Sequence, residues 1–136
     1  MATQKVICDT DVIIDYWNSK SKRYFDSRNI LDEIIGSENI VISTITRMEL
    51  IIGANNKTEL NKINKNSHNF EVSLINGDIA TLAVQLLQDY KLSHGLALPD
   101  AFIAATSIIT NFPLFTYNLK DYKFIIKLEL YQPENG

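Results

Sequence analysis

Short apolar segments rich in β-branched residues alternate along this chain with longer segments of helical periodicity, and this alternation limits the available folds more than any other feature. Lys5–Cys8, Asn39–Ser43, Phe70–Leu74 and Leu114–Thr116 are predicted strands, and Lys127–Tyr131 is a candidate fifth. A helix between two successive strands makes a crossover connection, which joins parallel strands. We therefore expect a three-layer α/β/α fold with a mostly parallel central sheet.

Helical periodicity and end signals place the helices between these strands. Thr44 is the expected N-cap of one helix, Pro99 the expected first residue of another, and Gly36, Gly95 and Pro113 the expected stops. Asn118–Tyr122 is expected to form a turn or a short helix. The predicted helical segments are Val12–Trp17, Ser27–Ile35, Ile45–Ile52, 57–67, Ile79–Tyr90 and Pro99–Ile108.

The length and composition predict one domain, residues 1–132, followed by a frayed tail at 133–136. The chain has 136 residues, of which 46% are hydrophobic, and this is enough to bury a sizeable core. Its apolar runs are too short to span a membrane, and its first residues are too acidic for a secretory signal. We therefore expect a cytoplasmic protein. The net charge of −3 argues against broad, non-specific adhesion to nucleic acid, although it does not exclude an RNA substrate.

Four polar side chains are predicted to gather at one edge of the sheet. Asp9 directly follows the first strand, Asp100 lies in the first turn of a helix, and Asn118 follows the fourth strand by two residues. Glu49 shares a helix face with Ile45 and Ile52, which predicts that it points inward. Ligand sites of open α/β sheets lie beyond the carboxyl ends of the strands, so this edge is the place to expect the chemistry.

An inward-facing group of carboxylates requires positive charge, because an unpaired buried ion costs several kcal/mol or becomes protonated. No arginine or lysine is spaced to neutralise the group. A divalent cation such as Mg²⁺ or Mn²⁺ would do so, since hard cations bind oxygen ligands. Such a cation can activate water and stabilise charge on a phosphodiester. The pattern therefore favours metal-dependent phosphodiester cleavage.

Other nucleophilic and metal-binding residues offer no competing site. His68 and His94 stand alone in polar surroundings and are predicted to be surface residues, and no serine or cysteine is paired with either. Cys8 lies inside an apolar strand and is predicted to be a buried structural thiol.

The acids also have structural interpretations, which the sequence leaves open. Asp9 could cap the following helix, and Asp100 could complement a helix dipole. Asp11 and Asp15 could be solvated residues of the first helix. Glu49 is the hardest to explain in this way, because its predicted face is apolar.

Four segments resemble the signature blocks of VapC-type PIN domains, and they occur in the order of that family. An acid or an amide stands at each expected place, and the blocks together span nearly the whole chain. They are Val6–Tyr16 (VICDTDVIIDY), Ile42–Leu50 (ISTITRMEL), Leu98–Thr106 (LPDAFIAAT) and Phe115–Tyr122 (FTYNLKDY).

The resemblance implies an endoribonuclease that uses Mg²⁺ or Mn²⁺ and acts as the toxin of a toxin–antitoxin pair. It implies that Asp9, Glu49 and Asp100 are the catalytic, metal-binding acids. The fourth block departs from the acidic form of many members, and offers Asn118 and, three residues later, Asp121 as further ligands. The resemblance also implies an RNA substrate, a cognate antitoxin protein and a homodimer. Candidate substrate contacts are Thr10, Thr116 and Asn118.

Two other functions remain open at this point. The sequence Asp9-Thr-Asp11 after an apolar strand resembles the first motif of haloacid-dehalogenase-type phosphatases, in which Asp9 would be a nucleophile. That class also needs a lysine and a late acidic pair, whereas the late region here has Pro99-Asp100 leading into a helix. The second alternative is an inactive PIN-like module that binds RNA or protein.

Overall fold

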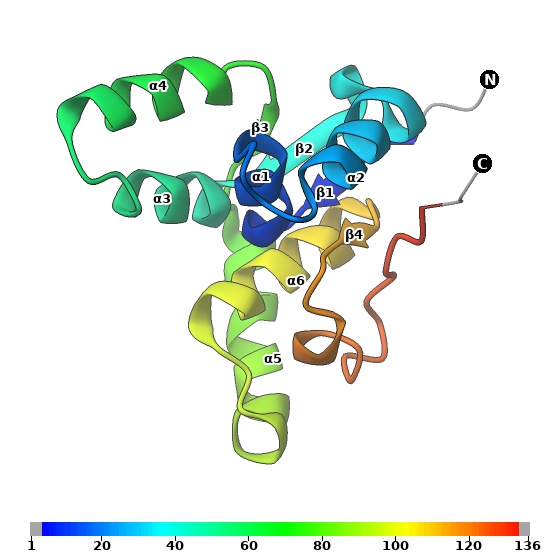
Figure 1. The fold of residues 1–136 in the computed structure, drawn as a ribbon. Helices are drawn as coiled ribbons and strands as arrows, with labels where there is room; N and C mark the ends of the chain where they lie inside the picture. Colours follow the sequence, from blue (N-terminus) through cyan, green and yellow to red (C-terminus); the bar gives the residue numbers. More distant parts are fainter. Residues whose placement is uncertain (1–3, 134–136) are drawn as a thin grey trace.

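The computed structural model describes residues 4–133, and within them a four-stranded, fully parallel sheet forms the centre of the molecule (Figure 1). The strand order is β3-β2-β1-β4. The strands are β1 (Val6–Cys8), β2 (Ile40–Ser43), β3 (Glu71–Ser73) and β4 (Leu114–Phe115). The expected parallel α/β fold is confirmed.

Helices make every crossover between these strands. They are α1 (Thr10–Trp17), α2 (Tyr24–Arg28), α3 (Thr44–Ile52), α4 (Lys57–Ser67), α5 (Gly77–His94) and α6 (Leu98–Thr110). A π-helical segment, η1 (Asn29–Ile35), continues α2, and the 3-10 helices η2 (Ser37–Asn39) and η3 (Leu119–Asp121) precede β2 and follow β4. The predicted helix Ser27–Ile35 is therefore correct in place but consists of two helical types.

The side chains of each strand point alternately to the two faces of the sheet, so the hydrophobic core has one part on each face. Ile7, Val41 and Leu114 pack against α5 and α6, whereas their strand neighbours face α1 and η1. Successive residues of a strand point to opposite faces, so strands that are buried on both sides must be apolar throughout. This explains why β1 reads Val-Ile-Cys without a polar residue.

The order of the strands places a topological switch point between β1 and β4. From β1 the chain moves to β2 and then to β3, and the connection through α5 and α6 returns it to the other side of β1. At such a point the connections leave in opposite directions, which opens a crevice at the carboxyl ends of the strands. Asp9 and Thr116, the residues that directly follow β1 and β4, meet at this crevice.

The predicted fifth strand, Lys127–Tyr131, is wrong. Leu130 makes one isolated parallel bridge to Leu114, supported by backbone hydrogen bonds from Leu114 N to Glu129 O and from Tyr131 N to Leu114 O. The residues before Leu130 form turns, in which Leu128 N donates to Ile125 O, so they do not lie alongside β4 and cannot pair with it. Of the expected tail, residues 134–136 lie outside the described residues.

Two helix ends also differ from the prediction by a few residues. The N-cap of α3 is Ser43, whose Oγ accepts from Ile45 N at 3.1 Å, and Thr44 is the first helical residue, with its hydroxyl donating to Ser73 O. Helix α6 ends before Pro113, because Asn111 adopts the left-handed conformation at φ 60°. Asparagine tolerates this conformation better than most residues, and so it stops the helix here.

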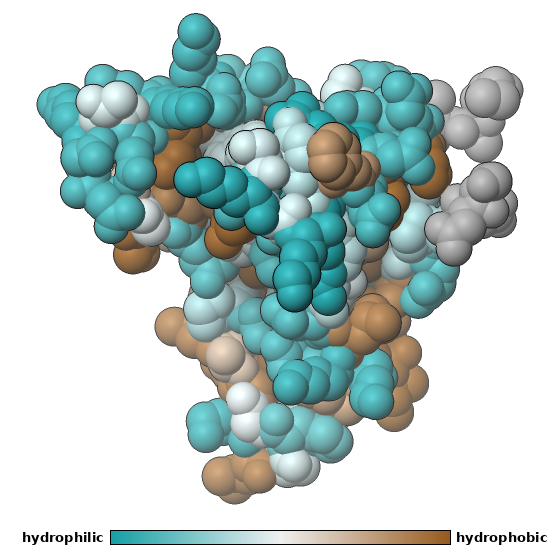
Figure 2. Space-filling model, in the orientation of Figure 1, coloured by the Kyte–Doolittle hydropathy of each residue, from teal (hydrophilic) through white to brown (hydrophobic). Residues whose placement is uncertain are grey.

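Helices α3 and α4 lie together and project from the body of the molecule (Figure 1). Apolar side chains are visible between them in Figure 2, although most of this face is hydrophilic. Leu50 is buried on α3, but Ile52 is 81% exposed, so the expected inward face shared by Ile45, Glu49 and Ile52 does not extend to the end of the helix. The helix leaves the sheet before Ile52, which removes the surface that would have covered it.

Candidate metal centre

Asp9 is the most deeply placed acid of the site. It follows β1, caps the N-terminus of α1 and is only 5% exposed. Its Oδ1 accepts from the backbone N–H of Thr10, and its Oδ2 accepts from the Thr116 hydroxyl, both at 2.8 Å. Capping, the structural interpretation of Asp9, is therefore correct, and it places the carboxylate at the crevice beside β4.

Asp100 reaches the same place from the other side of the sheet. It lies in the first turn of α6 and is half-buried. Its Oδ1 accepts a hydrogen bond of 3.0 Å from the phenol of Tyr122, a residue with no exposed surface. The same hydroxyl also lowers the pKa of Asp9, so Tyr122 acts on both acids while donating its hydrogen bond to Asp100.

Glu49 is connected to the site through Thr10. The Thr10 hydroxyl donates to Glu49 Oε1 at 2.6 Å and lies 3.0 Å from the hydroxyl of Thr46. Because Thr10 follows Asp9 directly, this bond brings the α3 carboxylate toward the end of β1. The structure thus places all three predicted acids around one strand-end crevice.

The pKa values of Asp9 and Asp100 are both raised in the folded protein. Burial raises the pKa of Asp9 from 3.8 to about 6, with a further contribution from the charge of Asp11. Burial also raises the pKa of Asp100 to about 6, and the charges of Asp9, Asp121 and Glu49 add to the effect. Hydrogen bonding opposes both shifts, because a donor stabilises the ionised form: Thr116 and Thr10 act mainly on Asp9, and Tyr122 acts on Asp100.

The charge of this group is not compensated by protein cations. The ion pairs within residues 4–133 join Lys5 to Glu71, Arg23 to Asp15 and Arg28 to Asp32. None of them includes Asp9, Glu49 or Asp100.

The donor set fits a hard divalent cation in its chemistry, because all three acids offer carboxylate oxygens and have no ion pair within residues 4–133. Their geometry is not that of a preformed metal site. In the described part of the chain, no group of three or more His, Cys, Asp or Glu side chains is arranged to hold a metal ion as it stands. The fit therefore lies in composition and charge.

The uncertain residues of the fourth block lie at different depths. Asn118 is exposed, and its backbone N–H donates to the Thr116 hydroxyl at 3.0 Å. Asp121 is half-buried on η3, and its charge raises the pKa of Asp100. Of the two, Asp121 is the one whose charge acts on a predicted metal ligand.

Asp11 borders the site but is bound by its own contacts. Its Oδ2 accepts from the backbone N–H of Tyr117 at 3.1 Å, and its buried Oδ1 has no hydrogen-bond partner. Burial raises its pKa as well. Asp11 thus adds negative charge beside Asp9 and increases the need for a cation.

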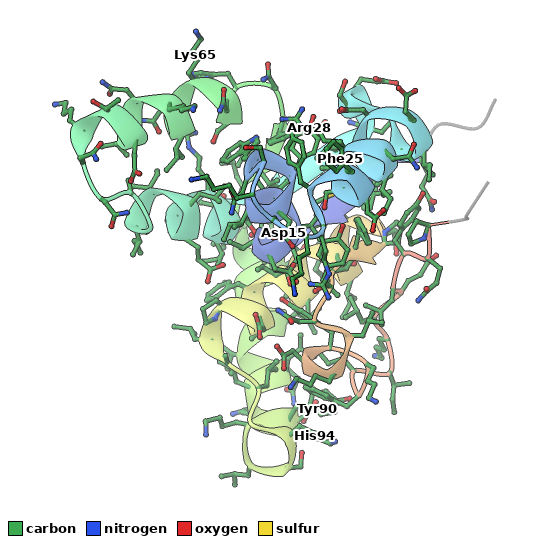
Figure 3. The ribbon with its side chains drawn as sticks, viewed as in Figure 1. Asp15, Phe25, Arg28, Lys65, Tyr90 and His94 are labelled. Atoms are coloured by element: carbon green, nitrogen blue, oxygen red, sulfur yellow. The ribbon has the colours of Figure 1, made fainter. Side chains whose placement is uncertain are left out.

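The remaining nucleophilic and imidazole groups lie elsewhere or are inert, as predicted. Cys8 is fully buried, and burial together with the charges of Asp9 and Asp11 raises the pKa of its thiol far above the ordinary range. His68 is exposed, and His94 is exposed near the end of α5, beside Tyr90 and stacked on Phe124 (Figure 3). Asp15 lies on α1, where Ser21 donates to it (Figure 3).

Two residues of the site were not found by sequence reasoning. Tyr122 was expected only as the end of a turn, and Thr46 only as a residue of a helix. Both act through a hydroxyl that contacts a residue distant in sequence: Tyr122 donates to the Asp100 carboxylate, and Thr46 accepts from the Thr10 hydroxyl. The one available signal for Tyr122 was its place directly after Asp121, within the fourth block of the resemblance.

Comparison with known proteins identifies the family. The PIN-domain family model matches residues 6–124, and the chain belongs to the PIN-domain family. It is 32% identical to ribonuclease VapC1 of Methanocaldococcus jannaschii over 121 residues, covering 88% of this chain and 79% of that protein. It is 27% identical to ribonuclease VapC19 of Mycobacterium tuberculosis over 125 residues, covering 90% and 96%. The predicted resemblance to VapC-type PIN domains is confirmed.

Solved structures agree with this assignment. A toxin–antitoxin complex from Klebsiella pneumoniae contains a chain that superposes with a TM-score of 0.74 at 29% identity, covering 96% of this chain and 98% of that one. VapBC2 from Rickettsia felis, bound to a fragment of promoter DNA, gives the same TM-score at 22% identity, covering 94% and 98%, and so supports the fold. The haloacid-dehalogenase interpretation of Asp9-Thr-Asp11 is therefore wrong.

The structure also bears on membrane association. Between residues 4 and 133, none of the helices has the length and apolar character needed to cross a bilayer.

Proposed function

We propose that this protein is an Mg²⁺- or Mn²⁺-dependent endoribonuclease and the toxin of a toxin–antitoxin pair. One observation carries the proposal: Asp9, Glu49 and Asp100 gather at the switch-point crevice of a PIN-domain sheet, and no described Lys or Arg forms an ion pair with them. The names of the VapC relatives supply the class of reaction, and the charge of the crevice supplies the need for a metal.

Asp9, Asp100 and Glu49 would hold the cation through their carboxylate oxygens. A bound Mg²⁺ or Mn²⁺ supplies the positive charge that orients a phosphodiester and lowers the pKa of an attacking water. The protein's own contribution is to hold the acids in place, with Thr116 donating to Asp9 and Thr10 donating to Glu49. These hydroxyls, which we predicted as substrate contacts, are engaged with carboxylates in the structure and reach a substrate through the acids they orient.

The fourth block would adjust the charge of the site. Asp121 acts on Asp100 from η3, while Asn118 lies at the exposed rim, where an amide can contact RNA or hold a water. We assign Asp121 the larger effect on the metal and Asn118 the larger effect on the substrate.

The partner assignments extend from the relatives. Chains similar to this one occur in toxin–antitoxin complexes, and we propose that a cognate antitoxin protein binds here and that the toxin forms a homodimer. A hollow of about 600 Å³ between α1, α3 and α4 includes Glu49 in its lining. Its lining combines apolar side chains, among them Ile14, Leu50 and Ile63, with polar ones, and such a mixed surface suits a protein segment that would approach the acidic site.

The experiment that tests the proposal is cleavage of structured RNAs by purified protein in Mg²⁺ or Mn²⁺, with chelator and with Asp9→Asn as controls. The proposal predicts internal cleavage that requires metal and is lost in the variant. Cleavage that persists in chelator, or that survives in Asp9→Asn, would contradict it. Metal binding without cleavage of any RNA would favour the alternative, an inactive PIN-like module that binds RNA or protein.

A further inference from the structure

We propose that Tyr122 is a positioning residue of the metal centre, whose buried hydroxyl orients the carboxylate of Asp100 so that it can bind a divalent cation together with Asp9. The inference rests on the proposed function, since it concerns the same acids. It adds a residue to which neither the sequence motifs nor the family match gives a role.

Tyr122 is buried, so its hydroxyl needs a hydrogen-bond partner inside the protein. The side chain has no exposed surface and packs in the core formed by α5, α6 and one face of the sheet. A phenylalanine ring would serve this packing equally well, and a buried hydroxyl is costly unless it finds a partner. The hydroxyl of Tyr122 donates to Oδ1 of Asp100 at 3.0 Å, and it also lowers the pKa of Asp9.

Tyr122 and the two acids come from separate parts of the chain. Asp9 follows β1, Asp100 lies in the first turn of α6, and Tyr122 directly follows η3. The hydrogen bond from Tyr122 therefore fixes the start of α6 against a segment that is distant in sequence. Since Asp9 and Asp100 carry like charge, this bond holds the Asp100 carboxylate in place against their repulsion.

The contact leaves the acids able to bind an ion. Each carboxylate has about four lone-pair sites, so one that accepts a hydrogen bond still offers others. Tyr122 uses Oδ1 of Asp100, while Thr10 and Thr116 use the two oxygens of Asp9. Hydrogen bonds of this kind fix the orientation of metal-binding carboxylates, and their removal weakens metal binding by about 10- to 100-fold.

The test is Tyr122→Phe, which removes the hydroxyl and keeps the ring. Calorimetric titration with Mn²⁺ in the absence of RNA should give a Kd about 10- to 100-fold weaker than that of the wild type. Cleavage at saturating RNA and fixed Mn²⁺ should fall in kcat with little change in KM, and excess Mn²⁺ should restore it.

The matched control is Tyr16→Phe, because the chain offers a second buried tyrosine whose hydroxyl donates to an aspartate. Tyr16 is 8% exposed and donates to Asp32 at 2.6 Å, a contact between α1 and η1 rather than between the predicted metal ligands. We expect this variant to lose stability without a change in the Kd for Mn²⁺.

A measurement on the unaltered protein covers the case in which Tyr122→Phe does not fold. With ¹³C placed at Cζ of the tyrosines, of which the chain has six, titration with Mg²⁺ should move one resonance strongly, as the hydrogen bond to the acids changes on binding. A Kd in Tyr122→Phe within twofold of the wild type, or no tyrosine resonance that responds to Mg²⁺, would overturn the inference. If the wild type binds no Mn²⁺ and cleaves no RNA, both the proposed function and the role of Tyr122 are wrong. If the wild type binds Mn²⁺ and cleaves RNA and Tyr122→Phe behaves identically, only the role of Tyr122 is wrong.

Discussion

Asp9→Asn should stabilise the metal-free protein at neutral pH, although it removes a predicted catalytic residue. The pKa of Asp9 rises from 3.8 to about 6 on folding, so at pH 7 the folded protein holds an ion that the environment disfavours. A difference of about two pKa units corresponds to roughly 3 kcal/mol. Asparagine removes this cost because it carries no charge.

The gain is partly offset by hydrogen bonding. Thr116 donates to Oδ2 of Asp9, and asparagine would present an NH₂ group to one of its two donors. The Thr116 hydroxyl can turn to accept from it, at a cost of about 1 kcal/mol. A net gain of roughly 2 kcal/mol remains, which for a domain of this size raises the melting temperature by about 6 °C.

The difference in stability between Asp9→Asn and the wild type should depend on pH. A group whose pKa is higher in the folded state binds more protons there, so its contribution to stability is complete below about pH 4 and is lost as the pH rises to about 6. The wild type in chelator should therefore lose stability across this window. The advantage of Asp9→Asn should be full at pH 7.5 and should disappear near pH 4.

The assay is thermal unfolding of wild type and variant in chelator at pH 4 and pH 7.5, and again with Mn²⁺. Metal should stabilise the wild type more than the variant, because a ligand stabilises the state that binds it. Asp89→Asn is the control, since Asp89 is exposed on α5 and accepts only from Gln85 among the described contacts. A variant that melts at or below the wild type at pH 7.5 in chelator would refute the reasoning that burial and neighbouring charge make the ionised Asp9 costly.

Glu49→Gln and Asp100→Asn should each reduce metal-dependent RNA cleavage by a factor of about 100 or more, which is the order of magnitude expected for the loss of one catalytic group. Circular dichroism should show an intact fold in both variants. A wild-type cleavage rate in either variant would remove that residue from the site. Asp121→Asn should impair cleavage less than Asp100→Asn, because Asp121 acts on Asp100 through its charge alone, and equal losses would make Asp121 a ligand. Asn118→Asp should tighten Mn²⁺ binding in calorimetry if the exposed rim reaches the ion, and weaker binding would show that it does not. Cys8→Ala should keep full cleavage activity at some cost in stability, since the thiol is buried and its pKa is raised, and loss of cleavage by the folded variant would contradict this.

Much of the fold was predictable because its two central strands, β1 and β2, are buried on both faces. Such strands are mostly apolar, and Val6–Cys8 and Ile40–Ile42 show this plainly in sequence. Lys127–Tyr131 alternates charged and apolar residues in the manner of a strand but pairs at Leu130 only. The difference comes from the turns that precede it, whose conformation depends on tertiary contacts that the sequence pattern does not express.

The acids of the site were predictable, and the groups that hold them were not. Asp9 and Asp100 stand beside a strand end and a helix start, which are features of local sequence. Tyr122 and Thr46 act through contacts across the fold, and nothing in their spacing distinguishes them from other residues of a turn or a helix. The outward turn of Ile52 has the same origin, because only the arrangement of the layers shows where α3 leaves the sheet.

The central claim is that Asp9, Glu49 and Asp100 hold one divalent cation together. Titration of the metal-free protein with Mn²⁺ at pH 7.5, followed by electron paramagnetic resonance, tests it most directly, with Asp9→Asn and Asp100→Asn beside the wild type. We predict a saturable site in the wild type that Mg²⁺ displaces and that both variants lose or weaken at least tenfold, as expected for removal of a charged ligand. Identical Mn²⁺ binding in all three proteins, or none in a wild type that still cleaves RNA in chelator, would contradict the claim.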